Sequence, residues 1–242
     1  MHSEYRWVLA ELVANPAVRV VVVTGTPPAF CVGGDSKALE GHSERGAYDA
    51  GLANDLAAPG YGVRPEFDAD FAFQFALRFP VIAAVNGAAA GVGLAIALFC
   101  DLRFAAADAK VTTAAPKLGL PAEYGMSWQL PRLVGVTRAA DLLLSGRVFT
   151  PEQTANWGLW NGILPDSEST LQAALEYAHH LATGVGPVAL ATTKAQLYAD
   201  LLHLSPARSI HESQRLLAEA MTTDEYREGV AALLEGRPPD FG

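Results

Sequence analysis

The segment from Pro80 to Asp101 constrains the fold of this chain more than any other part of the sequence. Its apolar run at 81–85 has the length and composition of a buried strand, and Asn86-Gly87 signals a turn. The uncharged residues 88–100 predict a helix whose first turn holds only alanine and glycine. Because no bulky side chain covers the unpaired N–H groups of such a helix start, they suit an anion or a carbonyl oxygen that gains charge. The segment therefore predicts an α/β fold with a candidate oxyanion site.

A chain of 242 residues, half of them hydrophobic, can bury a sizeable core in one large domain or two small ones. Its net charge of −9 argues against nucleic acid or an anionic membrane as a partner. We predict no membrane-spanning segment and no signal peptide, because no uncharged apolar run is long enough and the N-terminus has the wrong composition. Cys31 and Cys100 lack metal-ligand spacing, so we expect reduced thiols, no metal site and a cytoplasmic location.

Strand and helix patterns alternate in the first half of the chain, and helical patterns fill the second half. Strands are predicted at 19–24 (fully buried), 81–85, 102–106 and 110–113. Helices are predicted at 3–15, 66–79, 88–100, beyond 131, and at 171–183, 187–202, 210–221 and 224–235, with a turn and a short helix at 26–36 and a loop at 41–65. We expect one functional unit, with an α/β core over 1–184 and a helical region over 185–242.

The glycines Gly87, Gly91 and Gly93 have more than one explanation. Their spacing suits a dinucleotide-binding loop, but no tyrosine in the chain has a lysine four residues later, and the motif is not on the first strand. Close packing of a helix against a strand is a second explanation. A second glycine turn, Ala29 to Asp35, follows an earlier strand, and two such turns that converge would supply the two N–H donors of an oxyanion hole.

Longer motifs carry a resemblance to a known family. AFCVGGDSKAL and PVIAAVNGAAAGVGLAIALFCDLRFAAADAK, extended by GLPAEYGMSWQLPRLVG and LLLSGRVFTPEQTANWGLWNGILP, resemble the crotonase (enoyl-CoA hydratase/isomerase) superfamily along the whole chain. The resemblance implies a spiral of ββα units and a helical C-terminal trimerisation region. It also implies an acyl-CoA substrate, no cofactor besides the coenzyme A of that substrate, and a homotrimer or a dimer of trimers.

The resemblance places the oxyanion-hole N–H groups on Gly34 and Val92, where the family usually has glycine at the second position. The substrate-binding residues that it implies are Ala29, Val32, Gly33, Asp35, Gly91, Pro116, Lys117 and Leu120. Two positions depart from the hydratase pattern, because Ala95 and Lys117 stand where hydratases usually carry glutamates. Ordinary two-glutamate hydration is therefore in doubt.

Glu123 is the candidate that replaces them. It matches the position where dienoyl-CoA isomerases and an aromatic acyl-CoA dehalogenase carry an aspartate, and an apolar setting near Trp128 would raise its pKa. A solvated loop glutamate is the alternative. Family members also usually have a β-hairpin, which helps to hold coenzyme A, before the helix that begins this chain. We expect a hydratase/isomerase with Glu123 as acid/base, or alternatively a non-catalytic acyl-CoA-binding or assembly paralogue.

Overall fold

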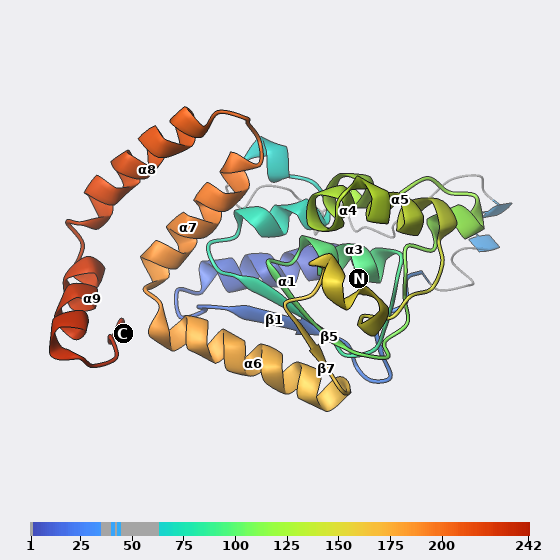
Figure 1. Cartoon of the computed structure of the whole chain (residues 1–242), viewed down its shortest axis with the longest axis horizontal. Coiled ribbons are helices and arrows are strands. Elements are labelled where there is room, and N and C mark those ends of the chain that lie inside the picture. The colour runs from blue at the N-terminus through green and yellow to red at the C-terminus, as the bar shows by residue number, and fades with distance from the viewer. Residues whose placement is uncertain (1, 35–39, 42, 45–62) are drawn as a thin grey trace.

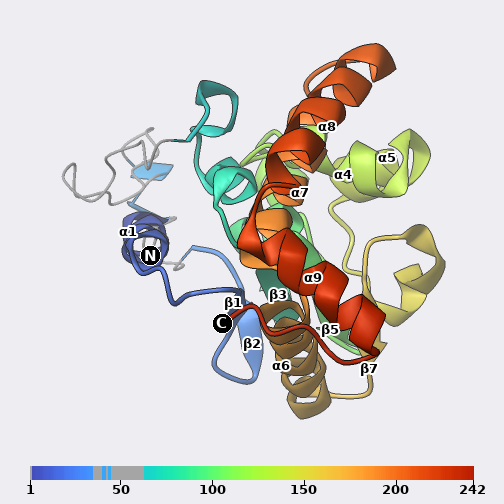
Figure 2. The same cartoon turned by 90° about the vertical axis from the view of Figure 1, so that its left-hand side faces the viewer.

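The computed structural model describes residues 2–34, 40–41, 43–44 and 63–242. An α/β body carries a group of C-terminal helices that extends away from it on one side (Figure 1). Asp35 and most of the predicted loop at 41–65 lie outside the described residues. The C-terminus returns to the first strand (Figure 2), where the Arg19 guanidinium donates to the Gly242 carbonyl at 2.9 Å.

Seven strands form two parallel sheets among the described residues. The larger sheet has the order β1 (Val21–Thr24), β3 (Val81–Val85), β5 (Leu102–Ala106) and β7 (Gly162–Leu164), and the smaller has the order β2 (Ala29–Cys31), β4 (Ala88–Ala90) and β6 (Val111–Thr112). From β1 to β6 the chain alternates between the two sheets, one strand in each. This alternation is the spiral of ββα units that the resemblance implies, so the predicted fold class is confirmed.

The helices cover the sheets from several sides. The remaining elements are α1 (His2–Ala14), η1 (Pro65–Phe67), η2 (Phe71–Ala76), α3 (Val92–Phe99), η3 (Ala115–Leu118), α4 (Met126–Val134), α5 (Val136–Ser145), η4 (Glu152–Trp157), α6 (Ser167–Gly184), α7 (Pro187–Asp200), α8 (Pro206–Ala220) and α9 (Asp224–Glu235), where η marks a 3₁₀ helix. Helix α6 lies along the larger sheet (Figure 1), and α3 packs against η2 and α4. The helices predicted in the second half are thus confirmed, together with strand β5, but strand β7 was not predicted.

Several predicted elements were wrong in type or extent. Residues 88–90 form strand β4 and not the first turn of a helix, because they pair with β2 on one side and β6 on the other. Strand β2 lies where a turn was predicted, and the helix predicted at 66–79 is two short 3₁₀ helices. Strand β1 is only partly buried, since it is the edge of its sheet.

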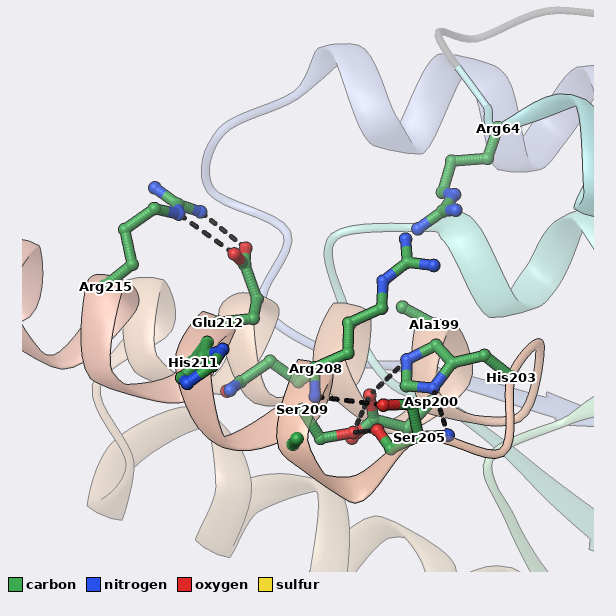
Figure 3. Close-up of a pocket in the computed structure, with 12 residues that line it drawn as sticks. Arg64, Ala199, Asp200, His203, Ser205, Arg208, Ser209, His211, Glu212 and Arg215 are labelled. Atoms are coloured by element: carbon green, nitrogen blue, oxygen red, sulfur yellow. Dashed lines mark hydrogen bonds and ion pairs between the residues drawn. The ribbon is translucent and has the colours of Figure 1, made fainter.

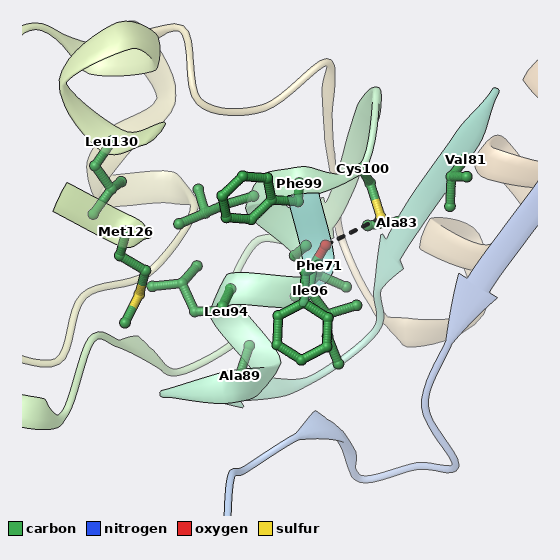
Figure 4. Packing of buried hydrophobic residues seen from close by; sticks show 14 of the residues in the cluster. Phe71, Val81, Ala83, Ala89, Leu94, Ile96, Phe99, Cys100, Met126 and Leu130 are labelled. Atoms are coloured by element: carbon green, nitrogen blue, oxygen red, sulfur yellow. Dashed lines mark hydrogen bonds between the residues drawn. The ribbon is translucent and has the colours of Figure 1, made fainter. Parts of the chain in front are cut away.

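The main core lies between α3, α4 and the aromatic residues of η2. Leu94 and Phe99 on α3 meet Met126 and Leu130 on α4, and all four side chains are buried (Figure 4). Every residue of α3 is buried, which is why this helix carries no charged side chain. The packing therefore fixes the position of α3, and with it the position of its first residue, Val92.

A buried ion pair joins α7 to this body. Lys194 Nζ lies 2.7 Å from Asp101 Oδ2 and donates to the Phe79 carbonyl at 2.8 Å. The same Asp101 oxygen accepts the Val81 N–H at 2.6 Å. Burial lowers the pKa of Lys194, while the negative charge of Asp101 opposes that change. Tyr198, one turn later on α7, stacks on Phe75 with ring centroids 3.9 Å apart.

Candidate active site

The candidate site residues follow the carboxyl ends of three neighbouring parallel strands. Gly33 and Gly34 follow β2, Gly91 and Val92 follow β4, and η3 follows β6. Since parallel neighbours end at the same edge of a sheet, the structure brings these three segments to one edge. We refer to residues 32–34, 91–93 and 113–125 as the strand-end region.

Two glycines let the backbones of β2, β4 and α3 approach closely. A Cβ atom on Gly93 would lie 2.0 Å from the Cys31 carbonyl oxygen, and one on Gly87 would lie 2.2 Å from the Pro28 carbonyl oxygen. No side chain fits at either place. Close packing of a helix against a strand is confirmed for Gly93, whereas Gly87 lies in a turn that packs against the residue before β2. Gly33 has φ +94° and its Cβ position lies 3.4 Å from the Ala90 carbonyl oxygen, so the turn after β2 lies against the end of β4.

The start of α3 offers backbone donors. Gly91 is the N-cap residue with φ 52°, and no side chain caps the helix. The Gly91 N–H donates to the Thr112 carbonyl of β6 at 3.2 Å, and the Ala95 N–H donates to the Gly91 carbonyl at 3.0 Å. Within the described part of the chain, no group accepts a hydrogen bond from the N–H of Val92 or of Gly34. Both predicted oxyanion donors therefore lie where β2 and β4 end, and the chain supplies them with no described acceptor.

The other residues near these donors differ in exposure. Ala29 pairs with Ala88 inside the small sheet, and the exposed Val32 follows at its end. The Val92 side chain is only 6% exposed and packs in the main core. Ala95, one turn along α3, is fully buried in the same core, so no ionisable group is present at that position.

The loop after β6 carries the remaining predicted residues. Ala114 has φ 62°, and the hydroxyl of Thr112 bonds to the Ala114 N–H and the Gly146 carbonyl, both at 3.0 Å. Pro116 packs against Gly146, while Lys117 and Leu120 are exposed. The exposed position of Lys117 fits a surface lysine. Sequence analysis gave no indication of the Thr112 and Ala114 turn, since a positive φ at alanine has no local signal.

Glu123 lies between η3 and α4 in the same loop. Its side chain is half-buried, and this burial raises the pKa of its carboxyl above the usual value because a charged carboxylate loses solvation there. The Glu123 carboxylate forms no hydrogen bond or ion pair with any residue that the structure describes. Its backbone carbonyl accepts the Met126 N–H at 3.0 Å, and Tyr124 follows with φ 51°.

The Tyr124 conformation orients the loop around Glu123. The Tyr124 ring meets Phe71 edge to face, with centroids 5.6 Å apart. Gly125, also at positive φ, lies against the Phe99 ring, 3.2 Å from its Cβ position, and begins α4. These contacts fix the two residues that follow Glu123, whose carboxyl lies at a partly desolvated position. A half-buried carboxyl with a raised pKa is the kind of group that can serve as a general acid or base.

Among the residues that the structure describes, no three His, Cys, Asp or Glu side chains come together as metal ligands. No helix of the described chain has the length and the apolar character needed to span a membrane.

Comparison with known proteins adds two kinds of similarity. The family model for enoyl-CoA hydratase/isomerase matches residues 1–242. The chain is 34% identical over 246 residues to 1,2-epoxyphenylacetyl-CoA isomerase of Escherichia coli K12, covering 100% of this chain and 87% of that protein. It is 31% identical to mevalonyl-coenzyme A hydratase of Beauveria bassiana, covering 99% of this chain and 84% of the relative.

Solved structures have the same fold. A crystal structure titled "probable enoyl-CoA hydratase/isomerase" from Mycobacterium abscessus superposes with a TM-score of 0.80 at 34% sequence identity, covering 98% of this chain and 85% of that chain. The similarity therefore extends across both the α/β body and the C-terminal helices.

Proposed function

The chain belongs to the enoyl-CoA hydratase/isomerase family, and on this premise we propose that it is an acyl-CoA isomerase or hydratase in which Glu123 moves the proton. The coarser statement, an acyl-CoA-processing enzyme of CoA-linked lipid metabolism, follows from the family itself. The observation that carries the finer proposal is that two N–H donors without a described acceptor follow the neighbouring strands β2 and β4, while a partly desolvated carboxyl lies in the loop after β6.

The proposed oxyanion hole consists of the Gly34 and Val92 N–H groups. Both follow neighbouring strand ends, and the second lies at the positive end of the α3 dipole. Two N–H donors would hold the thioester oxygen of an acyl-CoA while it becomes an enolate oxygen. The loss of one such donor typically costs about 3–4 kcal/mol of transition-state stabilisation. Ala29, Val32, Gly33, Asp35, Gly91, Pro116, Lys117 and Leu120 are the proposed substrate-binding residues around it.

The proposed role of Glu123 is acid/base catalysis. Its carboxylate would remove a proton from one carbon of the acyl chain, and the electron pair would pass to the thioester oxygen as the enolate. Return of the proton to another carbon shifts the double bond. Because syn hydration generally uses two carboxylates and Ala95 and Lys117 replace both usual ones, a single carboxyl favours isomerisation over hydration.

The test is the Glu123→Gln variant, assayed with a 3-enoyl-CoA and with crotonyl-CoA in D2O. The glutamine keeps the shape but cannot take up the proton, so we expect kcat to fall by about 10²–10⁴-fold. Mass spectrometry follows deuterium in the acyl chain, and ultraviolet absorbance follows the enoyl band. Glu168→Gln, on α6, is the matched control and should keep full activity, because α6 covers the far side of the larger sheet.

The result separates the proposal from its alternative. Full activity of Glu123→Gln would overturn the role of Glu123 and leave the family activity standing. No deuterium exchange by the unaltered protein on any acyl-CoA, together with retained CoA binding, would instead support the non-catalytic paralogue. Isomerisation without hydration would favour the isomerase over the lyase.

We further propose that the C-terminal helices assemble the chain into a homotrimer or a dimer of trimers. Large apolar side chains on α7, α8 and α9 are exposed, among them Leu197, Leu217 and Leu233, the last with 80% of its surface accessible. Exposed apolar surface of this kind favours protein contacts. Residues 185–242 would act with the core 1–184 as one functional unit. Light scattering should give a mass three or six times that of one chain.

A cytoplasmic location, and catalysis without a further cofactor, remain predictions.

A further inference from the structure

A charged cavity of about 730 Å³ lies at the junction of α7 and α8. The cavity is lined by the end of α7, by the turn at His203 and Ser205, and by the first turns of α8. Arg64, from the segment before η1, also lines it (Figure 3). None of the residues proposed for the strand-end site lines this cavity.

Two arginines face each other across the cavity. Arg208 extends from α8 toward Arg64, and their guanidinium groups point at one another (Figure 3). The Arg64 side chain makes one long hydrogen bond to Glu66 at 3.4 Å. The Arg208 side chain donates no hydrogen bond and forms no ion pair with any described residue, since only its backbone N–H is bonded, to the Ser205 hydroxyl at 3.3 Å. Two positive groups that face each other repel, unless an anion lies between them.

The acidic side chains that line the cavity are bonded to residues other than Arg64 and Arg208. Asp200 accepts from Ser209 at 2.8 Å and pairs with His203 at 3.2 Å. Glu212 accepts two hydrogen bonds from Arg215, at 3.0 and 2.6 Å. Arg215 is the main cause of the lowered pKa of Glu212, to which Arg208 adds only a weaker attraction. The cavity therefore leaves Arg208 as a cation with no described carboxylate partner, in a chain whose net charge is −9.

Arg208 differs in this respect from the other arginines. Every other arginine in the described part of the chain donates a side-chain hydrogen bond to a carboxylate or to a backbone carbonyl. The cavity also lies at the N-terminal turn of α8, where the helix dipole adds positive potential.

We propose that this cavity is a second binding site, for a phosphate group of a small anionic ligand held between Arg64 and Arg208. One guanidinium saturates a planar carboxylate through two parallel hydrogen bonds, whereas a tetrahedral phosphate has oxygens directed to both sides and can bind two. The phosphate would belong either to the nucleotide part of a coenzyme A thioester or to a separate phosphate compound. The proposal does not depend on the chemistry proposed for Glu123.

The test is calorimetry with inorganic pyrophosphate and with adenosine 3′,5′-bisphosphate at constant ionic strength. We expect Arg208→Gln and Arg64→Gln each to weaken binding by about tenfold or more, since an intact charge-assisted pair is worth at least that factor. Arg208→Lys keeps the charge without the planar fork and should lie between these variants and the unaltered protein. Arg227→Gln, which removes an equal charge from α9, is the matched control and should bind as the unaltered protein does.

Competition distinguishes the two sources. Displacement of pyrophosphate by coenzyme A in an Arg208-dependent manner would assign the phosphate to the nucleotide part of the substrate. Pyrophosphate binding that requires Arg208 but does not respond to coenzyme A would assign it to a separate compound. Equal affinities of Arg208→Gln and Arg227→Gln, or no binding of either probe at millimolar concentration, would overturn the proposal. Circular dichroism of each variant shows that a loss of binding is not a loss of fold.

Discussion

The strand-end region and the C-terminal helices α7–α9 differ in which groups of the chain they present, backbone N–H donors in the first and exposed side chains in the second. In the strand-end region the groups that matter are backbone N–H donors, and α3, which positions one of them, is buried along its whole length. Helix α8, by contrast, has no buried residue, and the groups that distinguish it are exposed arginine, histidine and leucine side chains. A site formed by backbone groups depends on how the surrounding elements pack, whereas a site formed by exposed side chains depends on which residues are present. The two regions should therefore respond differently to small changes.

The attachment of the C-terminal helices should show the largest effect on stability. In Lys194→Met the largely buried carboxylate of Asp101 loses its cation, and removing one partner of a buried ion pair typically costs about 3–5 kcal/mol. Urea unfolding measures this loss. Lys110→Met, at an exposed lysine, is the control and should change the unfolding midpoint little. A Lys194→Met protein as stable as the control would mean that the stacked Tyr198 and Phe75, and not the ion pair, hold α7 on the body.

The strand-end region should be intolerant of a single methyl group. In Gly93→Ala the added Cβ would meet the Cys31 carbonyl oxygen, so α3 and β2 must separate. Overpacking of this kind typically costs about 1–3 kcal/mol. Since the shift also moves Gly34 away from Val92, we expect activity on acyl-CoA to fall further than the loss of folded protein explains. Unfolding curves and specific activity, measured on the same samples, check this.

The same substitution in the C-terminal helices should have the opposite sign. Gly229 lies within α9, and no atom lies within 4 Å of its Cβ position. Alanine there should stabilise the protein by roughly 0.5–1 kcal/mol, because glycine loses more backbone freedom in a helix. If Gly93→Ala and Gly229→Ala changed stability equally, the contrast between a packed region and an open one would fail.

The difference between the regions also decides what the sequence can predict. Strand β5 and helix α9 follow their hydrophobic patterns, and both were predicted to the residue. Strand β4 was missed because three alanines have no strand preference of their own, and pairing with β2 and β6 decides their conformation. The family resemblance predicted Glu123 as the acid/base residue, whereas the partial burial of its side chain is set by the fold. The pairing of Lys194 with Asp101, 93 residues apart, and the facing of Arg64 and Arg208 depend wholly on tertiary structure, for which no local pattern exists.

The smallest effect concerns the stability cost of the proposed catalytic carboxyl. Because burial raises the native-state pKa of Glu123 above its ordinary value of 4.5, the native state binds the proton more tightly than the unfolded state does. Protonation of Glu123 therefore stabilises the folded protein relative to its ionised form. This stabilisation is fully present below the unfolded pKa and is lost as pH rises through the raised native pKa. Glu123→Gln, which stays neutral, should therefore melt higher than the unaltered protein at neutral pH and equally at about pH 4.

Asp141→Asn should show the reverse, since the hydrogen bonds from Arg147 lower the pKa of Asp141. It should melt lower than the unaltered protein at neutral pH, and the difference should vanish as pH falls. Thermal midpoints of both variants at the two pH values check the signs. A Glu123→Gln protein that melts lower at neutral pH would mean that the carboxylate is stabilised where it lies. In that case Glu123→Gln would lose activity without gaining stability, and the carboxyl would not be a catalytic group that the fold holds at a cost in stability.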